Sequence, residues 1–284
     1  MIQLYPVSLE KWEDTAQKAD PSWYLDPIVA LQKREAHLAC LRKWAPRETP
    51  KRVLKTDLFE EAFGEDTVMQ DLFPQAEMKF GVDIALSTVR GARSRLTSGT
   101  DQFAVADVRS LPIQSNSIDL IYSGSTLDHF ESAKEFRQAI AELVRVLKPG
   151  GRIIITMDNL SNPMYRVLRR VTRTRFGPFP LGYTTTAEGL KSALGDAGLN
   201  VLGGEFLIHN PRLLSTMLFM GTRFLFRKHA DGPIRLMLGL FDSLRHLGSE
   251  RFTACFVSAC AEKAVVTPMK KPNTQESLQE FAMR

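Results

Sequence analysis

The chain has 284 residues, of which 44% are hydrophobic and 24% are charged. This composition is typical of soluble globular proteins, and it excludes a disordered chain, a collagen-like repeat and a bare coiled coil. The net charge of +5 is unevenly distributed, because residues 1–159 carry 20 basic and 23 acidic side chains whereas residues 160–284 carry 17 and 9. The basic C-terminal part favours an acidic partner or surface.

Neither a membrane-spanning segment nor a secretion leader is predicted. The longest charge-free stretch of the hydrophobic C-terminal region covers residues 213–222, and a transmembrane helix needs about 20 apolar residues. Residues 1–10 are mixed in character and lack an apolar run followed by a cleavage site. We therefore expect a cytoplasmic protein.

The cysteines and histidines do not predict a metal site. The three cysteines cannot all pair and form no Cys-x-x-Cys motif, which favours reduced, buried thiols; a metal site or redox switch is the alternative. The histidines outside the sites discussed below show no metal-ligand spacing. These residues are Cys40, Cys255, Cys260, His37, His229 and His246.

Beyond residue 50, short apolar runs alternate with helical patterns, which predicts an α/β fold with a mostly parallel sheet. Strands are expected over residues 53–58, 78–84, 103–108, 118–123, 153–156, 201–208 and 252–261. Helices are expected over residues 24–44, 66–73, 85–95, 132–147, 185–197 and 211–247, the last of them broken near 230–233. The helix over 132–147 carries the clearest signals, because Ser132-x-x-Glu135 forms a capping box and Lys148-Pro149-Gly150-Gly151 should stop the helix.

These elements suggest four parts of the chain. An N-terminal helical cap is expected over residues 1–50 and a nucleoside-binding core over 51–160. Residues 161–267 should complete the sheet and add a helical lid, and residues 268–284 should form a flexible polar tail.

Two acids stand at the predicted ends of neighbouring strands. In open parallel sheets, ligands bind outside the carboxyl ends of the strands. Asp83 could accept both hydroxyls of a ribose through charge-assisted hydrogen bonds. Asp107 could accept the exocyclic amine of adenine, while Ala106 and Val108 pack on the ring. The alternative for each acid is a helix cap or a solvated loop residue.

Further candidates follow the fourth and fifth predicted strands. The loop from Ser123 to His129 is small and polar, and His129 is the candidate general base because its ordinary pKa lies near 6.5. Its alternative role is to cap or pack against the helix that begins near Ser132. Asp158, Asn159 and, more remotely, His209 are candidates for the acceptor pocket.

Three motifs of the core resemble the class I S-adenosylmethionine-dependent methyltransferases, in their type 11 branch. They are Ala-Asp-Val-Arg-Ser-Leu-Pro at 106–112, Asn-Ser-Ile-Asp-Leu-Ile-Tyr-Ser at 116–123 and Leu-Val-Arg-Val-Leu-Lys-Pro-Gly-Gly at 143–151. The resemblance covers roughly residues 53–159. It implies a Rossmann-like, seven-stranded, mostly parallel sheet with helices on both faces and a helical C-terminal insertion or lid. It also implies that S-adenosyl-L-methionine is the cofactor, with Asp83 on its ribose, Asp107 beside its adenine, and the segment from Ser123 beside its methionine part.

The chain departs from this family in the loop after the first strand. The family has a glycine-rich loop there, whereas this chain has Asp57, Phe59 and Glu61. Because S-adenosylmethionine has no phosphate, side chains can replace backbone contacts: Asp57 or Glu60 could accept its amino group and Thr56 could bond to its carboxylate. The candidate cofactor-binding residues are Thr56, Asp57, Glu60, Asp83, Ile84, Ala106, Asp107, Val108, Ser123 and Ser125. A fold that has lost cofactor binding, or one that binds another nucleoside, is the alternative.

The resemblance implies transfer of a methyl group to an oxygen or nitrogen of a small or lipid-like acceptor; the alternative is an inactive nucleoside-binding or scaffold protein. The chain lacks the glycine motifs of nicotinamide and nucleoside-triphosphate sites. Arginines interleave with apolar residues over 164–179, and basic residues border the apolar helix beyond 211. Such segments could rest on an anionic membrane, enclose a greasy substrate, or form a lid packed on the sheet. Nucleic acid is disfavoured, because aromatic residues are not interleaved with the basic run.

Overall fold

The computed structural model describes residues 8–18, 26–96, 99–172 and 182–265. The predicted tail over 268–284 and the arginines at 173 and 175 lie outside these residues.

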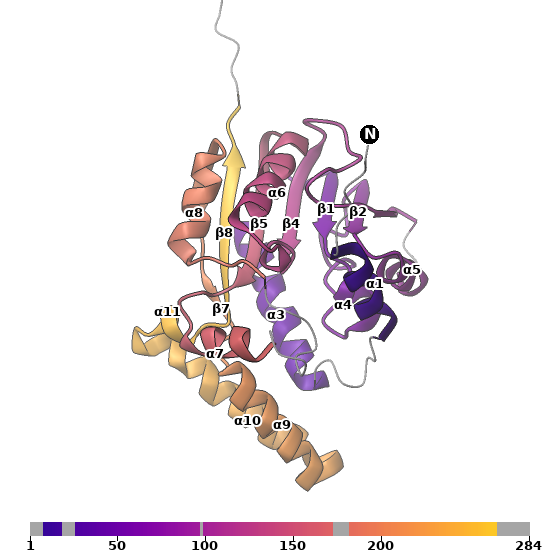
Figure 1. The fold of residues 1–284 in the computed structure, drawn as a ribbon. Helices are drawn as coiled ribbons and strands as arrows, with labels where there is room; N and C mark the ends of the chain where they lie inside the picture. The colour runs from indigo at the N-terminus through magenta and orange to yellow at the C-terminus, as the bar shows by residue number, and fades with distance from the viewer. Residues whose placement is uncertain (1–7, 19–25, 97–98, 173–181, 266–284) are drawn as a thin grey trace, which may run out of the picture.

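A central sheet with the strand order β3-β2-β1-β4-β5-β8-β6 forms the middle layer, and the short β7 pairs with β8 (Figure 1). The first five strands are parallel, whereas β8 runs antiparallel to β5, β6 and β7. The strands are β1 Arg52–Thr56, β2 Met78–Asp83, β3 Asp101–Val105, β4 Ile118–Gly124, β5 Leu147–Asp158, β6 Leu199–Gly203, β7 Phe206–Leu207 and β8 Phe256–Lys263. The predicted α/β class and mostly parallel sheet are confirmed; the described residues contain one more strand than expected, the two-residue β7.

Helices cover both faces of the sheet (Figure 1). The helices that precede the C-terminal region are α1 Ser8–Lys18, α3 Pro27–Trp44, α4 Phe59–Phe63, α5 Leu86–Arg95, η1 Leu127–His129, α6 Ala133–Val146, α7 Pro163–Thr172 and α8 Ala187–Asp196. Adjacent strand residues point to opposite faces. Leu54 and Ile153 therefore pack in the core beneath α6 and α8, whereas Val53 and Ile154 pack beneath α3. Because both faces are covered, these strands are apolar on both sides.

The predicted helix over residues 66–73 is wrong. The helix of this region is α4, which ends at Phe63, and the residues up to β2 form turns. The amide groups of Val68 and Met69 donate to Glu61 Oε1 at 3.1 and 3.2 Å, so a side chain satisfies them instead of helix carbonyls. The buried carboxylate of Glu61 thereby replaces helix formation in this segment.

Several element boundaries also differ from the prediction. The third strand lies two to three residues earlier than expected. The last strand begins at Phe256, because α11, Glu250–Thr253, occupies the residues before it. The capping box of α6 is confirmed, since Ser132 Oγ accepts from the Glu135 amide at 3.3 Å. However, α6 already ends at Val146, and the Lys-Pro-Gly-Gly segment lies inside β5.

The C-terminal helices form a hairpin at the edge of the sheet where the parallel strands end (Figure 1). They are α9 Arg212–Phe226, η2 Arg227–His229, α10 Asp231–Asp242 and η3 Ser243–Leu247. Phe219, Ile234 and Leu238 pack against Ile28 of α3. Among the described residues, no helix is long and apolar enough to cross a membrane.

Candidate functional site

The loops that follow β1, β2 and β3 meet at one edge of the sheet. The Asp57 amide donates to the Val82 carbonyl at 3.0 Å, and the Ala106 amide donates to the Asp83 carbonyl at 2.9 Å. Asp83 pairs in register with Val105, two residues before Asp107. The two aspartates therefore lie on neighbouring strand ends at the same edge, as the sequence predicts.

Asp57 keeps the backbone conformation of a glycine-containing loop. Its φ of 67° lies in the left-handed region, which glycine adopts freely and which aspartate tolerates better than most residues. Its Oδ1 accepts from the Phe59 amide at 2.8 Å and so holds the start of α4. The loop thus contains a left-handed residue without a glycine, and that residue carries a carboxylate.

Asp83 connects the loop after β1 to the start of α5. Its Oδ2 accepts from the Leu58 amide at 2.9 Å, and its Oδ1 accepts from the Ala85 amide at 2.8 Å. Burial raises the pKa of Asp83, although these two amides oppose the shift. Each carboxylate oxygen retains a second lone pair that can accept a hydroxyl hydrogen. The contact with the ribose hydroxyls stays a prediction. Ile84 follows in the same half-buried loop.

Asp107 is engaged by Arg109. The guanidinium donates to both carboxylate oxygens, at 3.0, 3.0 and 2.6 Å, and to Glu135 of α6 at 2.6 Å. It also lies 5.3 Å from the centre of the Phe130 ring. Val108 is buried in the core, and Ala106 packs against the same core. An adenine amine at Asp107 would therefore share the carboxylate with Arg109.

The hydroxyls of two predicted cofactor-binding residues form hydrogen bonds inside the fold. Thr56 Oγ1 donates to Ser123 Oγ at 2.9 Å and lies 2.6 Å from Thr126 Oγ1. Thr56 and Ser123 are almost completely buried. These contacts join β1 to the end of β4, so the two hydroxyls hold strands together, and Ser125 rather than Ser123 reaches the cavity described next.

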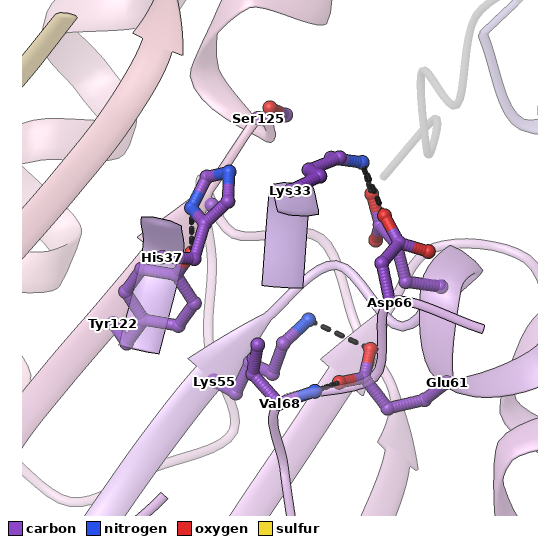
Figure 2. Close-up of a pocket in the computed structure, with 10 residues that line it drawn as sticks. Lys33, His37, Lys55, Glu61, Asp66, Val68, Tyr122 and Ser125 are labelled. Atoms are coloured by element: carbon purple, nitrogen blue, oxygen red, sulfur yellow. Dashed lines mark hydrogen bonds and ion pairs between the residues drawn. The ribbon is translucent and has the colours of Figure 1, made fainter. Parts of the chain in front are cut away.

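A small polar cavity lies between α3 and the ends of β1 and β4 (Figure 2). Glu60 and Ser125, which the sequence singles out, line it, together with residues that the sequence analysis missed. The full lining consists of Lys33, His37, Lys55, Glu60, Glu61, Asp66, Val68, Tyr122, Gly124 and Ser125. The space enclosed by these residues, about 20 Å³, is close to the volume that one water molecule needs.

Ion pairs organise this cavity. Lys33 Nζ lies 2.9 Å from Glu60 Oε1 and 2.6 Å from Asp66 Oδ2. Lys55 Nζ lies 2.8 Å from Glu61 Oε2, and both side chains are buried (Figure 2). Lys55 also donates to the Asp57 carbonyl. Helix α3 and the loop after β1 are thus held together by charge.

Acids outnumber bases in and beside the cavity. We call Asp57, Glu60, Glu61, Asp66 and Asp83 the acidic cluster; the lysines that face it are Lys33 and Lys55. Burial, Glu60 and Asp83 raise the pKa of Asp57 well above its usual value. Burial acts in the opposite direction on Lys55, but the surrounding carboxylates hold its pKa above the ordinary value. The surplus of acid suits a ligand that carries positive charge.

His37 is the histidine among the cavity-lining residues. Tyr122 Oη lies 2.7 Å from His37 Nδ1. Burial, with Lys33 adding to it, lowers the pKa of His37 to about 3, so the ring is neutral at physiological pH. Its Nε2 is buried and has no hydrogen-bond partner among the described residues. A ligand group in the cavity can therefore bond to this nitrogen.

His129, the predicted base, does not line the cavity. Its ring packs edge-on against Trp12 of α1, with the ring centres 4.7 Å apart. The neighbouring Asp128 is buried, and its Oδ2 accepts from the Asp158 amide at 2.8 Å. The Oδ1 atom of Asp128 has no hydrogen-bond partner within the described residues. Burial and the charge of Asp158 raise the pKa of Asp128 to about 6.

We expect Asp128→Asn to stabilise the protein at pH 7–8 by about 1–2 kcal/mol. The raised pKa means that folding disfavours the ionised carboxylate, so stability falls as the pH rises from about 4 to about 6. Asparagine keeps an oxygen for the Asp158 amide without the charge. Urea unfolding at pH 7.5 and pH 4 measures the effect. A gain that persists unchanged at pH 4 contradicts this explanation.

The remaining acceptor-site candidates serve the fold. Asn159 is buried and donates to the Arg251 and Ala254 carbonyls at 2.9 and 3.0 Å. His209 is buried with its Nδ1 2.9 Å from Thr253 Oγ1. Neither these two residues nor Asp158 line the cavity. Their substrate role stays a prediction.

The described residues contain no group of acids, histidines and cysteines arranged to hold a metal ion. The three cysteines are buried and form no disulfide with one another, and Cys255 Sγ donates to the Asn210 carbonyl at 2.8 Å. Among the other lining residues, Lys55 has a visible signal in the sequence, because a lysine directly follows two apolar residues inside a predicted strand. A helix that precedes the sheet in sequence supplies Lys33 and His37, and no local pattern relates it to the later strands.

Part of the chain matches known methyltransferases in sequence. Residues 59–155 match the model of the methyltransferase domain family. A malonyl-[acyl-carrier protein] O-methyltransferase of Methylococcus capsulatus is 35% identical over 132 residues, 45% of each chain. Its counterpart in Hahella chejuensis is 30% identical over 86 residues, 30% of this chain and 29% of that protein. The matches thus span less than half the length of these curated relatives.

A solved structure extends the likeness to nearly the whole chain. Haemonchus contortus phosphoethanolamine N-methyltransferase 2, in complex with S-adenosyl-L-methionine, superposes with a TM-score of 0.59 at 17% identity. The superposition covers 93% of this chain and 62% of that one. The fold is that of the class I S-adenosylmethionine-dependent methyltransferases. Within this class, residues 59–155 form a methyltransferase domain of the type 11 branch.

Proposed function

We propose that the protein transfers a methyl group from S-adenosyl-L-methionine to an oxygen or nitrogen of a small or lipid-like acceptor. The observation that carries the proposal is the surplus of carboxylates at the carboxyl edge of the sheet, beside a small polar cavity. S-adenosylmethionine carries a sulfonium and an ammonium group, and both are stabilised by nearby carboxylates.

The cofactor contacts follow from the placement of the loops. In this proposal, Asp83 accepts the ribose hydroxyls through its remaining lone pairs, and Asp107 accepts the adenine amine. Ile84, Ala106 and Val108 border the adenine from the same two loops. Asp57 and Glu60 hold the ammonium, and Ser125 lies at the methionine end of the cavity. The buried hydroxyls of Thr56 and Ser123 set the distance between β1 and β4.

Bound S-adenosylmethionine supplies an electrophilic methyl group, and the protein aligns an acceptor in line with it. Alignment alone contributes up to about 7–11 kcal/mol. The names of the curated relatives specify O-methylation of a malonyl group on a carrier protein, which favours an oxygen acceptor here. A carboxylate acceptor needs no base, whereas a hydroxyl or amine gains about 10²–10⁴ in rate from one.

His129 is the proposed base for an acceptor that carries a proton. His129→Ala should then lower turnover and leave the affinity for S-adenosylmethionine unchanged. Unchanged turnover with such an acceptor would remove His129 from the mechanism, and the same measurement on His37→Ala tests the histidine that lines the cavity.

Isothermal titration with S-adenosylmethionine and S-adenosylhomocysteine tests cofactor binding. We expect micromolar binding, and roughly 10–100-fold weaker binding for Asp57→Asn, since a hydrogen bond to a charged group contributes about 1.5–3 kcal/mol. Asparagine tolerates the left-handed backbone and still accepts from Phe59, so the variant isolates the charge.

The pH dependence of this titration follows from the raised pKa of Asp57. Protonation removes the negative charge, so affinity for the cationic cofactor should fall as the pH is lowered through that pKa. Glu77→Gln, an exposed acid paired with Lys51, is the matched control and should bind as the unmodified protein does. Absence of heat in the unmodified protein would favour an inactive scaffold protein.

A further inference from the structure

Helix α9 exposes an apolar face to solvent. Six large apolar residues of this helix are exposed, with exposed fractions from 41% to 82%. Five of them and Gly221 occupy one continuous side of the helix, since positions three, four and seven apart share a face. The six residues are Met217, Leu218, Met220, Phe224, Leu225 and Phe226. A helix at the surface of a globular protein normally turns its polar side to solvent.

Helix α10 also exposes apolar residues. Leu236 and Leu240, one turn apart, are 66% and 61% exposed, while the opposite side of α10 buries Ile234 and Leu238 against α3 and α9. We call the outward side of the two helices the hairpin face; it consists of the six residues of α9 with Leu236 and Leu240. Patches of this kind on soluble proteins mark interaction sites.

Cations border the hairpin face. Arg227 and Lys228 directly follow Phe226, and Arg235 precedes Leu236; all three are exposed, and none forms an ion pair with another described residue. The acids of the hairpin are engaged elsewhere: Asp231 pairs with Arg223 at 2.6 Å, and Asp242 pairs with Arg245. The border of the face therefore carries net positive charge.

We propose that the hairpin face docks on an anionic lipid bilayer, with its apolar side chains in the headgroup–acyl boundary and Arg227, Lys228 and Arg235 on the lipid phosphates. Interfacial helices combine an apolar face with a basic border in this way. The apolar residues stand free rather than in a groove, so they match a fluid apolar layer better than a shaped protein surface. The hairpin lies at the edge of the sheet where the parallel strands end (Figure 1), and the cavity lies among the ends of β1 and β4 at that edge.

Vesicle co-sedimentation without cofactor tests this proposal independently of methyl transfer. The protein is mixed with vesicles of phosphatidylcholine alone and of phosphatidylcholine with phosphatidylglycerol. We expect binding to the mixed vesicles, weaker binding to the neutral ones, and release as the salt concentration rises. Arg227→Glu/Lys228→Glu should lower binding to the mixed vesicles at least roughly tenfold, because each cation near an anionic surface contributes about 1 kcal/mol.

Phe224→Asp/Leu225→Asp should lower binding to both kinds of vesicle, roughly tenfold or more, because it removes apolar anchors. Val265→Asp is the matched control: it replaces a similarly exposed apolar residue beyond the end of β8, at the opposite edge of the sheet. Circular dichroism checks that each variant is folded. Two results overturn the proposal. In the first, the unmodified protein stays in the supernatant with both kinds of vesicle. In the second, Phe224→Asp/Leu225→Asp binds the vesicles as strongly as the unmodified protein. If the unmodified protein stays in solution and gel filtration shows a dimer that this variant dissociates, the hairpin face is an interface between copies.

Discussion

Replacing Lys55 with methionine should lower the free energy of unfolding by about 3–5 kcal/mol, as expected when one partner of a buried ion pair is removed. Lys55 Nζ and Glu61 Oε2 lie 2.8 Å apart, and their side chains are 3% and 0% exposed. The variant leaves the Glu61 carboxylate buried beside Glu60 and Asp57 without its cation. Chemical denaturation at neutral pH, followed by circular dichroism, measures the loss.

The double variant Lys55→Met/Glu61→Gln provides the control. Glutamine removes the uncompensated charge, and its Oε1 still accepts from the Val68 and Met69 amides that hold the segment after α4. We expect the double variant to recover most of the stability lost in the single variant. Replacing both charges of a buried ion pair often costs little stability. If the double variant is as unstable as Lys55→Met, the ion pair is not the reason for the loss.

Replacing Asp83 with alanine should weaken S-adenosylmethionine binding about 100-fold or more. Two charge-assisted hydrogen bonds to a ribose contribute about 3 kcal/mol or more together. The same carboxylate also holds the amides of Leu58 and Ala85, so the loop that carries Asp57 loses its support. Isothermal titration on the folded variant measures the change in dissociation constant.

Asp119→Ala separates binding from general stability. Asp119 also accepts from two backbone amides, those of Lys51 and Arg52 at 3.1 and 2.7 Å, but it does so at the amino edge of the sheet. This variant loses a comparable backbone contact far from the candidate site, so it should bind the cofactor with unchanged affinity. Equal weakening in both variants, or none in a folded Asp83→Ala, contradicts the ribose assignment.

The fold follows from local patterns that the sequence shows plainly. The capping box of Ser132 and the apolar strands fix α6 and the middle of the sheet, because side-chain periodicity and caps act over a few residues. The predicted helix over 66–73 fails for the opposite reason. Glu61, a residue outside that segment, takes its amides, and no pattern within the segment records this.

The candidate site is only partly predictable from the sequence. Asp83 and Asp107 stand at strand ends, and parallel strands bring such ends together by topology alone. The cavity depends on α3 instead, whose Lys33 and His37 meet β1 and β4 through tertiary packing. The sequence therefore predicts His129, which follows a strand. Its role stays a prediction, while the structure adds His37 as a second histidine to test.

Helix α3 contacts both the C-terminal hairpin and the cavity. Asp26 caps its first turn by accepting from the Ile28 amide at 2.9 Å, and the same carboxylate receives Arg223 of α9 at 2.8 Å. Seven and eleven residues after Asp26, the same helix places Lys33 and His37 at the cavity. If α9 shifts, either the ion pair between Arg223 and Asp26 breaks or α3 moves with α9. A displacement of the hairpin can therefore be transmitted through α3 to the residues that line the cavity.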